Sequence, residues 1–138
     1  MALKIHLKPD ERLILGGTVV TNGNKSCSLS IENNVPVLRQ KDILSQKEAN
    51  TPCRRIYFVV QLMYVDEHNL VIHHNTYWTL VQDLLKAAPS MLGLIDQISE
   101  QILNGRYYQA LKISRELINH EEEVLRSEYE FSRSVQHC

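Results

Sequence analysis

No aromatic residue precedes Tyr57 in this chain of 138 residues. An RNA-recognition motif and a typical single-strand-binding OB-fold display aromatic side chains on their sheets, so neither describes the N-terminal part. The longest uncharged apolar run, residues 56–65, is far shorter than the roughly 20 residues that a membrane-spanning helix needs. The opening residues MALKIHLKPDE carry charges where a signal peptide has its apolar run. We therefore expect no secretion and a cytoplasmic location.

Cysteine is also scarce. The chain has three cysteines, an odd number, and they are widely spaced with no CxxC pair: Cys27, Cys53 and Cys138. This pattern predicts free thiols in a reducing compartment rather than a framework of disulfides.

Motifs of catalysis and of cofactor binding are missing as well. The sequence contains no GxSxG or Walker A motif, and its Gly16-Gly17 pair lacks the third glycine of a dinucleotide fold. His68, His73 and His74 fall in a stretch that reads as a loop, with no cysteine or distant histidine at metal spacing. We predict no metal, no cofactor and no enzymatic activity.

Charge is unevenly distributed along the chain. Residues 1–55 carry nine Lys/Arg and five Asp/Glu, whereas residues 56–138 carry six and eleven. Such asymmetry indicates two surfaces with different partners. A basic N-terminal part would suit a polyanion such as RNA, and an acidic C-terminal part would suit protein.

Residues 3–44 read as short strands separated by tight turns. In residues 3–8, Leu and Ile alternate with Lys4, His6 and Lys8, which is the period-2 pattern of a half-buried strand. Gly16-Gly17 suits a turn with positive φ, and Asn22-Gly23-Asn24 is typical of a β-hairpin. Further strands are predicted at 12–15, 18–21, 26–31 and 35–39.

The rest of the chain reads as helical. Residues 45–53 form a polar connector in which Thr51-Pro52 is typical of a helix start. The next run, 54–66, is ambiguous: its β-branched and aromatic residues favour a strand, while its length and cap favour a buried helix, which we prefer. Three more helices are predicted, from Asn75 or Thr76 to about 87, from Pro89 to Asn104-Gly105, and from Arg106 to about Arg126.

These elements predict an α+β protein. A small N-terminal antiparallel sheet or barrel-like lobe, residues 1–50, would carry the basic charge. A C-terminal helical bundle, residues 51–127, would end in an αα-hairpin, because the last two helices are joined by a very short connection. Residues 128–138 would form a polar, frayed tail. The two lobes would share one continuous domain.

Candidate contact residues follow from charge and position. Cations that could meet RNA phosphates are Lys4, Lys8, Arg12, Lys25, Arg39, Lys41, Arg54 and Arg55. The plainer alternative is that lysines simply keep an exposed sheet soluble. In the helical part, a protein partner could meet the hairpin tip and the acidic rim: Tyr107, Tyr108, Glu121 and Glu122. These glutamates lie late in their helix, where carboxylates oppose the helix dipole, so another role is indicated.

Four segments carry a resemblance to a known family. They are LKIHLKPDERLILGGTVVTNG (3–23), VLRQKDIL (37–44), TPCRRIYFVVQLMYVD (51–66) and NGRYYQALKISRELINHE (104–121). In this order, over nearly the whole chain, they resemble the flagellar biosynthesis repressor FlbT family of alphaproteobacteria. The resemblance implies a post-transcriptional regulator that associates with the 5′ untranslated region of flagellin mRNA and promotes its decay, while in some relatives the regulator acts positively instead. It also implies work opposite a small partner, FlaF, and a link to flagellin export.

Three hypotheses compete. The first is an RNA-binding repressor that holds the flagellin mRNA leader on its basic N-terminal face. The second is a protein-interaction module whose helical part binds flagellin or FlaF, so that the effect on the message is indirect. The third and least favoured is an RNA-cleaving enzyme, which would degrade leader RNA on its own.

Overall fold

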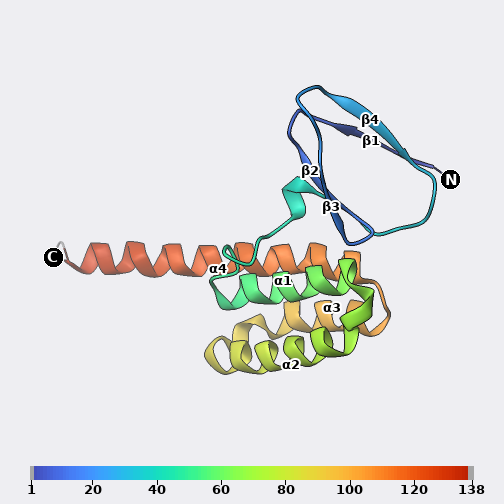
Figure 1. Ribbon diagram of the computed structural model, residues 1–138. Coiled ribbons are helices and arrows are strands. Elements are labelled where there is room, and N and C mark those ends of the chain that lie inside the picture. Colours follow the sequence, from blue (N-terminus) through green and yellow to red (C-terminus); the bar gives the residue numbers. More distant parts are fainter. Residues whose placement is uncertain (1, 137–138) are drawn as a thin grey trace. The chain divides into compact units, whose positions relative to one another are not determined.

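The computed structural model describes residues 2–136, so Cys138, one of the predicted free thiols, lies outside them. Within these residues, five short strands precede four α-helices, which confirms the predicted α+β class (Figure 1). The chain divides into two compact units. We call residues 1–43 with 64–68 the β unit, and residues 44–63 with 69–138 the helical unit.

The β unit contains two antiparallel sheets. Its strands are β1 (Leu3–Leu7), β2 (Arg12–Leu15), β3 (Thr18–Thr21), β4 (Cys27–Ile31) and β5 (Val37–Arg39). One sheet pairs β1 with β4, and the other has the order β3-β2-β5. Ile5 and Leu7 of β1 are buried and Lys4 and His6 are exposed, as the period-2 pattern predicts, but Leu3 at the start of the strand is exposed as well. The core of the unit consists of Ile5, Leu7 and Leu13, with Leu15, Cys27, Leu29, Ile31 and Val37 packed against it.

The hairpin between β2 and β3 turns at Gly16 and Gly17. Their φ angles of +58° and +86° are those of a two-residue hairpin turn, which glycine adopts without a steric clash. A Cβ atom on Gly17 would lie 3.0 Å from the carbonyl oxygen of Val65. The predicted role of this glycine pair is confirmed.

The hairpin predicted at residues 22–24 is wrong. This segment joins β3 to β4, which belong to different sheets. Asn22 instead stabilises the connection between the two sheets, because its Nδ2 donates to the carbonyl oxygens of Lys8 and Lys25, at 2.8 and 2.9 Å. Its Oδ1 accepts a hydrogen bond from the Cys27 thiol at 3.2 Å. The asparagine therefore serves a connection between sheets.

The helical unit is built on α1 (Pro52–Val65), α2 (Leu70–Ala87), α3 (Leu92–Leu103) and α4 (Tyr107–Gln136). The ambiguous run is helical, and Ile56, Val60 and Met63 are buried on one side of it. Their spacing by four and three places them on a single helical face. The last two residues of α1 cluster with the β unit.

A short connection joins α3 to α4 and confirms the predicted αα-hairpin. Gly105, with φ of +72°, donates its N–H to the carbonyl oxygen of Ile102 at 3.0 Å. The N–H of Arg106 donates to the carbonyl oxygen of Gln101 at 2.8 Å. This pair of hydrogen bonds is the Schellman motif that ends a helix at glycine.

Two helix boundaries differ from the predictions. The loop placement of His73 and His74 is wrong, because α2 begins at Leu70 and buries His73 on the face that also holds Tyr77 and Val81. The predicted end of the last helix near 126 is also wrong, because α4 continues to Gln136. No glycine or proline follows Gly105, so no strong local signal stops the helix there.

Candidate functional site

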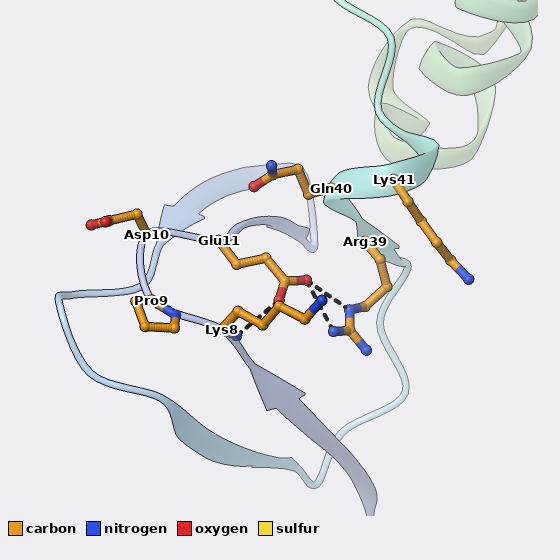
Figure 2. Close-up of a pocket in the computed structure, with 7 residues that line it drawn as sticks. All are labelled: Lys8, Pro9, Asp10, Glu11, Arg39, Gln40 and Lys41. Atoms are coloured by element: carbon orange, nitrogen blue, oxygen red, sulfur yellow. Dashed lines mark hydrogen bonds and ion pairs between the residues drawn. The ribbon is translucent and has the colours of Figure 1, made fainter.

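Three of the cations predicted to contact RNA line one pocket of the β unit. Lys8 directly follows β1, Arg39 ends β5, and Lys41 lies in the short 3₁₀ helix η1 (Gln40–Asp42). The pocket has a volume of about 620 Å³, and Pro9, Asp10, Glu11 and Gln40 complete its lining (Figure 2). Positively charged residues from early and late parts of the unit's sequence therefore meet in one concavity.

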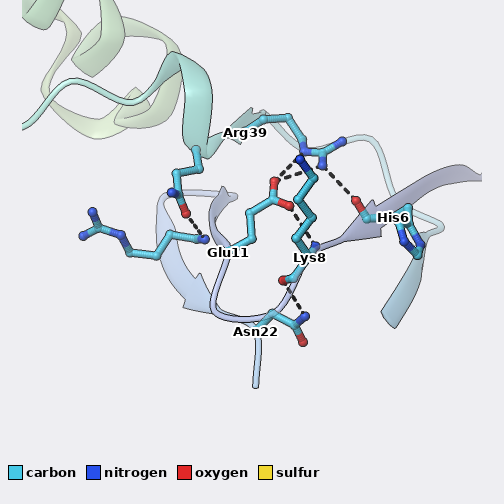
Figure 3. Close-up of polar contacts among 7 residues, drawn as sticks. His6, Lys8, Glu11, Asn22 and Arg39 are labelled. Carbon is cyan, nitrogen blue, oxygen red and sulfur yellow. Dashed lines mark hydrogen bonds and ion pairs between the residues drawn. The ribbon is translucent and has the colours of Figure 1, made fainter. Parts of the chain in front are cut away.

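A carboxylate holds Arg39 at this pocket. Arg39 donates from Nε and Nη2 to Oε2 of Glu11, at 3.3 and 2.9 Å, and from Nη2 to the carbonyl oxygen of His6 at 2.8 Å (Figure 3). The backbone N–H of Lys8 donates to the other Glu11 oxygen at 2.9 Å. This N–H and the Arg39 guanidinium lower the pKa of Glu11. The side chain of Arg39 remains 37% exposed, so a ligand can still reach it.

Glu11 is a site residue that the sequence patterns did not predict. Its position in the turn between two strands was visible, but its pairing with a residue at the end of β5 depends on how the sheets close. A carboxylate surrounded in sequence by Lys8 and Arg12 was the available signal.

The other predicted cations of the β unit lie outside the pocket lining. Lys4 is on the outward face of β1, opposite Ser30 of β4. Arg12 begins β2, and its backbone N–H donates to the side-chain oxygen of Gln40 at 2.6 Å. Lys25 lies in the connection before β4. All three cationic side chains are exposed, so they add positive charge to the surface of the unit.

Arg54 and Arg55 belong to the first turn of α1, in the helical unit. Arg54 donates to Oδ1 of Asn50 at 2.8 Å and pairs with a carboxylate oxygen of Glu122 at 3.2 Å. Arg55 is exposed. A predicted RNA-contacting residue and a predicted partner-contacting residue, Arg54 and Glu122, therefore pair with each other.

Glu121 has an internal role in the helical unit. Its side chain is buried and accepts hydrogen bonds from the hydroxyl of Thr51 and from the backbone N–H of Cys53. These donors stand at the start of α1, where backbone N–H groups lack partners within their own helix. The carboxylate of one helix thus caps another. Burial and the Glu121 charge raise the pKa of the Cys53 thiol far above its usual range.

The two tyrosines at the hairpin are half-buried. The hydroxyl of Tyr107 lies 3.2 Å from Nε2 of His74. The ammonium group of Lys112 lies 4.8 Å from the centre of the Tyr108 ring, a cation–π contact. Both rings therefore already take part in contacts within the helical unit.

In the helical unit, burial is the main cause of the shifted pKa values of Cys53 and Tyr77. Burial raises the pKa of Tyr77 to about 12, and its hydroxyl lies 2.9 Å from the hydroxyl of Ser99. Like the Cys53 thiol, this group is held in its neutral, less nucleophilic form. Over residues 2–136, no three His, Cys, Asp or Glu side chains gather in a way that could hold a metal ion.

Grouping the charges by structural unit changes their apparent distribution. The β unit holds six Lys/Arg and six Asp/Glu, and the helical unit holds nine and ten. Lys47, Arg54 and Arg55 count toward the helical unit, while Asp66 and Glu67 count toward the β unit. The net positive charge of residues 1–55 is thus not the net charge of a folded unit. Any attraction for a polyanion must come from local clusters such as the pocket.

In the part of the chain that the structure describes, no helix combines the length and the apolar character needed to cross a membrane. The fold and the site define a two-unit α+β protein with a pocket that is lined by three cations and two carboxylates. The model of the family "Flagellar protein FlbT" matches residues 3–125. The chain therefore belongs to the FlbT family, and it is a regulatory protein rather than an enzyme.

Curated relatives agree with this family over most of their length. A probable flagellum biosynthesis repressor protein FlbT 1 from Bradyrhizobium diazoefficiens is 47% identical, over 94% of this chain and 88% of the relative. A probable repressor FlbT from Rhodopseudomonas palustris is 40% identical, over 91% and 98%. The flagellum biosynthesis repressor protein FlbT of Caulobacter vibrioides is 38% identical, over 91% and 90%. No solved structure matches the chain significantly.

Proposed function

We propose that this protein represses flagellin synthesis after transcription. It would bind the 5′ untranslated region of flagellin mRNA in the cytoplasm, repress translation and promote degradation of the message. The FlbT family and the names of the relatives support a repressor of flagellum biosynthesis. The observation that carries RNA contact is the pocket lined by Lys8, Arg39 and Lys41.

The chemistry of this pocket suits phosphate groups. Figure 2 shows Arg39 and Lys41 extending to the same side, whereas Asp10 points away from them. Glu11 neutralises part of the Arg39 charge but also fixes the guanidinium in one orientation. A guanidinium held in this way can present its remaining N–H groups to phosphate oxygens. Because the first 56 residues contain no aromatic side chain, contact would rest on phosphates more than on base stacking.

The remaining predicted RNA contacts form an outer set in this proposal. Lys4, Arg12 and Lys25 are exposed on the β unit and could extend the path of the RNA backbone from the pocket. Arg54 and Arg55 belong to the helical unit and would contribute separately. Arg54 is paired with Glu122 and, unlike Arg39, does not lie beside Lys8 and Lys41 in the pocket lining, so we expect its share in RNA binding to be the smallest.

Titration of leader RNA across salt tests the proposal. In the variant Lys8→Gln/Lys41→Gln, the slope of log affinity against log salt should become shallower by about 0.7–0.9 for each phosphate that the protein no longer neutralises. Lys47→Gln/Lys86→Gln is the matched control, because it also removes two positive charges, from exposed lysines of the helical unit. If the double variant binds leader RNA with the affinity and slope of the parent, the pocket is not the RNA site.

A second candidate function is a chaperone-like module that binds flagellin or FlaF and affects expression indirectly. Exposed apolar residues on the second half of α4, such as Leu125 and Phe131, favour it. The predicted contacts Tyr107, Tyr108 and Glu121 give it less support, because they are engaged inside the helical unit. Capture of purified FlaF or flagellin without leader RNA binding at low salt would favour this function over the first.

A further inference from the structure

Helix α4 is packed along its first half and exposed along its second. In the first half, Ala110, Leu111, Leu117 and Ile118 are buried. From residue 122 to residue 133, by contrast, every side chain is exposed. This second half therefore lacks the apolar packing that usually stabilises a helix in a protein. Its exposed apolar side chains are Val124, Leu125, Tyr129 and Phe131.

The exposed half repeats the sequence pattern of the packed half. Residues 117–123 read LINHEEE and residues 124–130 read VLRSEYE. The two segments agree in the two leading aliphatic residues and in the glutamates at the fifth and seventh places. A step of seven residues returns to nearly the same side of an α-helix. Glu128 therefore continues the face of Glu121, one heptad later.

In the packed segment, residues 117–123, the glutamates of this pattern contact the start of α1. Glu121 accepts hydrogen bonds from Thr51 and from the backbone N–H of Cys53, at the N-terminus of α1. The adjacent Glu122 pairs with Arg54 in the first turn of the same helix. The helix that contacts these glutamates is thus α1, which has an apolar face and a basic first turn.

We propose that the exposed face formed by Val124, Leu125, Glu128 and Tyr129 is a docking site for a helix of another protein. The partner would be an amphipathic helix whose first turn carries Arg or Lys. Leu125 and Tyr129 pack against its apolar stripe, in the helix-in-groove manner of many peptide complexes. Glu128 accepts hydrogen bonds from its first N–H groups and interacts favourably with the positive end of its dipole. This inference does not depend on RNA binding.

Charge argues against a second copy as the occupant. Residues 122–133 carry four glutamates and two arginines, so each copy would bring a net negative charge to the contact. A parallel pairing through this face would also place Glu128 beside Glu128 of the other copy. Desolvating two like charges is costly. A partner helix with a basic first turn removes both penalties.

Two designed peptides test the proposal on the full chain. They share one leucine-striped helical sequence, begin with Arg-Arg or with Glu-Glu, and carry fluorescein for anisotropy titrations. We expect the Arg-first peptide to bind the parent protein about tenfold more tightly than the Glu-first peptide. Leu125→Asp should weaken binding of the Arg-first peptide by at least about tenfold. Glu128→Gln should remove most of the preference between the two peptides.

Glu123→Gln is the matched control, because it makes the same charge change on the opposite side of α4, and it should preserve both affinities. Circular dichroism confirms that each variant folds. The proposal is overturned if neither peptide binds at about 100 μM, or if Glu128→Gln keeps the preference. It is also overturned if sedimentation shows a dimer that Leu125→Asp dissociates, since the occupant is then a second copy. Leu125→Asp should still bind leader RNA. A loss of peptide binding in this variant then concerns the docking site alone and leaves the RNA-binding proposal untouched.

Discussion

Glu11 in the β unit and Glu121 in the helical unit make similar bonds in different surroundings. Each carboxylate accepts hydrogen bonds from one backbone N–H and from the side chain of one residue that is distant in the sequence. Both carboxylates are largely covered, since Glu121 is 9% exposed and the Glu11 side chain is 13% exposed. The donors differ: the Cys53 N–H that meets Glu121 is buried, whereas the Arg39 side chain that meets Glu11 is 37% exposed to water. When a buried acceptor is removed, its donors lose their hydrogen bonds and cannot replace them with water, which destabilises the fold. Donors that reach solvent can bond to water instead, so the loss is smaller.

The difference separates two uses of the same residue. In the helical unit the carboxylate completes the packing of two helices and contributes to stability. In the β unit the carboxylate orients a surface guanidinium beside two lysines, and its main effect is on the charge presented by the pocket.

The largest effect is expected from Glu121→Ala. The N–H of Cys53 and the hydroxyl of Thr51 would lose their acceptor in a buried place, which costs about 1–3 kcal/mol in the free energy of unfolding. Urea denaturation followed by circular dichroism measures this loss. Glu123→Ala, on the exposed side of the same helix, should change stability by less than about 0.5 kcal/mol. Equal effects of the two substitutions would remove the distinction between buried and exposed carboxylates.

A smaller effect is expected from Gly17→Ala, which tests whether the β unit also depends on one close contact. An alanine would hold a positive φ at a cost of about 1–2 kcal/mol, and its Cβ would press on the carbonyl oxygen of Val65. Gly23→Ala is the control, because no atom lies within 4 Å of the added Cβ. The same urea experiment compares the two. A Gly23→Ala variant as unstable as Gly17→Ala would contradict the assigned strain.

The smallest effect concerns the titration of Glu11. Because the folded state lowers its pKa, its contribution to stability is present above the ordinary glutamate pKa of about 4.3 and is lost as the pH falls through the lowered value. The Lys8 amide donates to this carboxylate, so its NMR shift should report a midpoint below the ordinary pKa. In Arg39→Gln the pKa should rise part of the way back, while Lys25→Gln should leave it unchanged. An unchanged midpoint in Arg39→Gln would mean that the guanidinium does not influence Glu11.

Several elements could be predicted because their signals are local. The strands at 12–15 and 18–21 follow from β-prone runs around Gly16-Gly17, and Thr51-Pro52 marks the start of α1. Asn104-Gly105 marks the end of α3 in the same way. In each case the decisive residues are neighbours in the sequence, so backbone preference alone selects the structure.

Pairings between distant segments could not be predicted in this way. Asn22 has the local signature of a hairpin, yet it fastens a crossing between sheets, because strand pairing is decided by which apolar faces close on each other. Glu121 has the local signature of a surface charge, yet it caps α1. The gathering of Lys8, Arg39 and Lys41 likewise depends on the closure of the β unit.

The amino-acid sequence by itself determined the order of strands and helices, the family and the absence of catalytic motifs, since all of these reside in short patterns. Only the tertiary structure decided which charges are neutralised internally and which remain exposed. The physical reason is that a side chain's partners are set by burial and by contacts between segments far apart in the chain, and no local pattern records them.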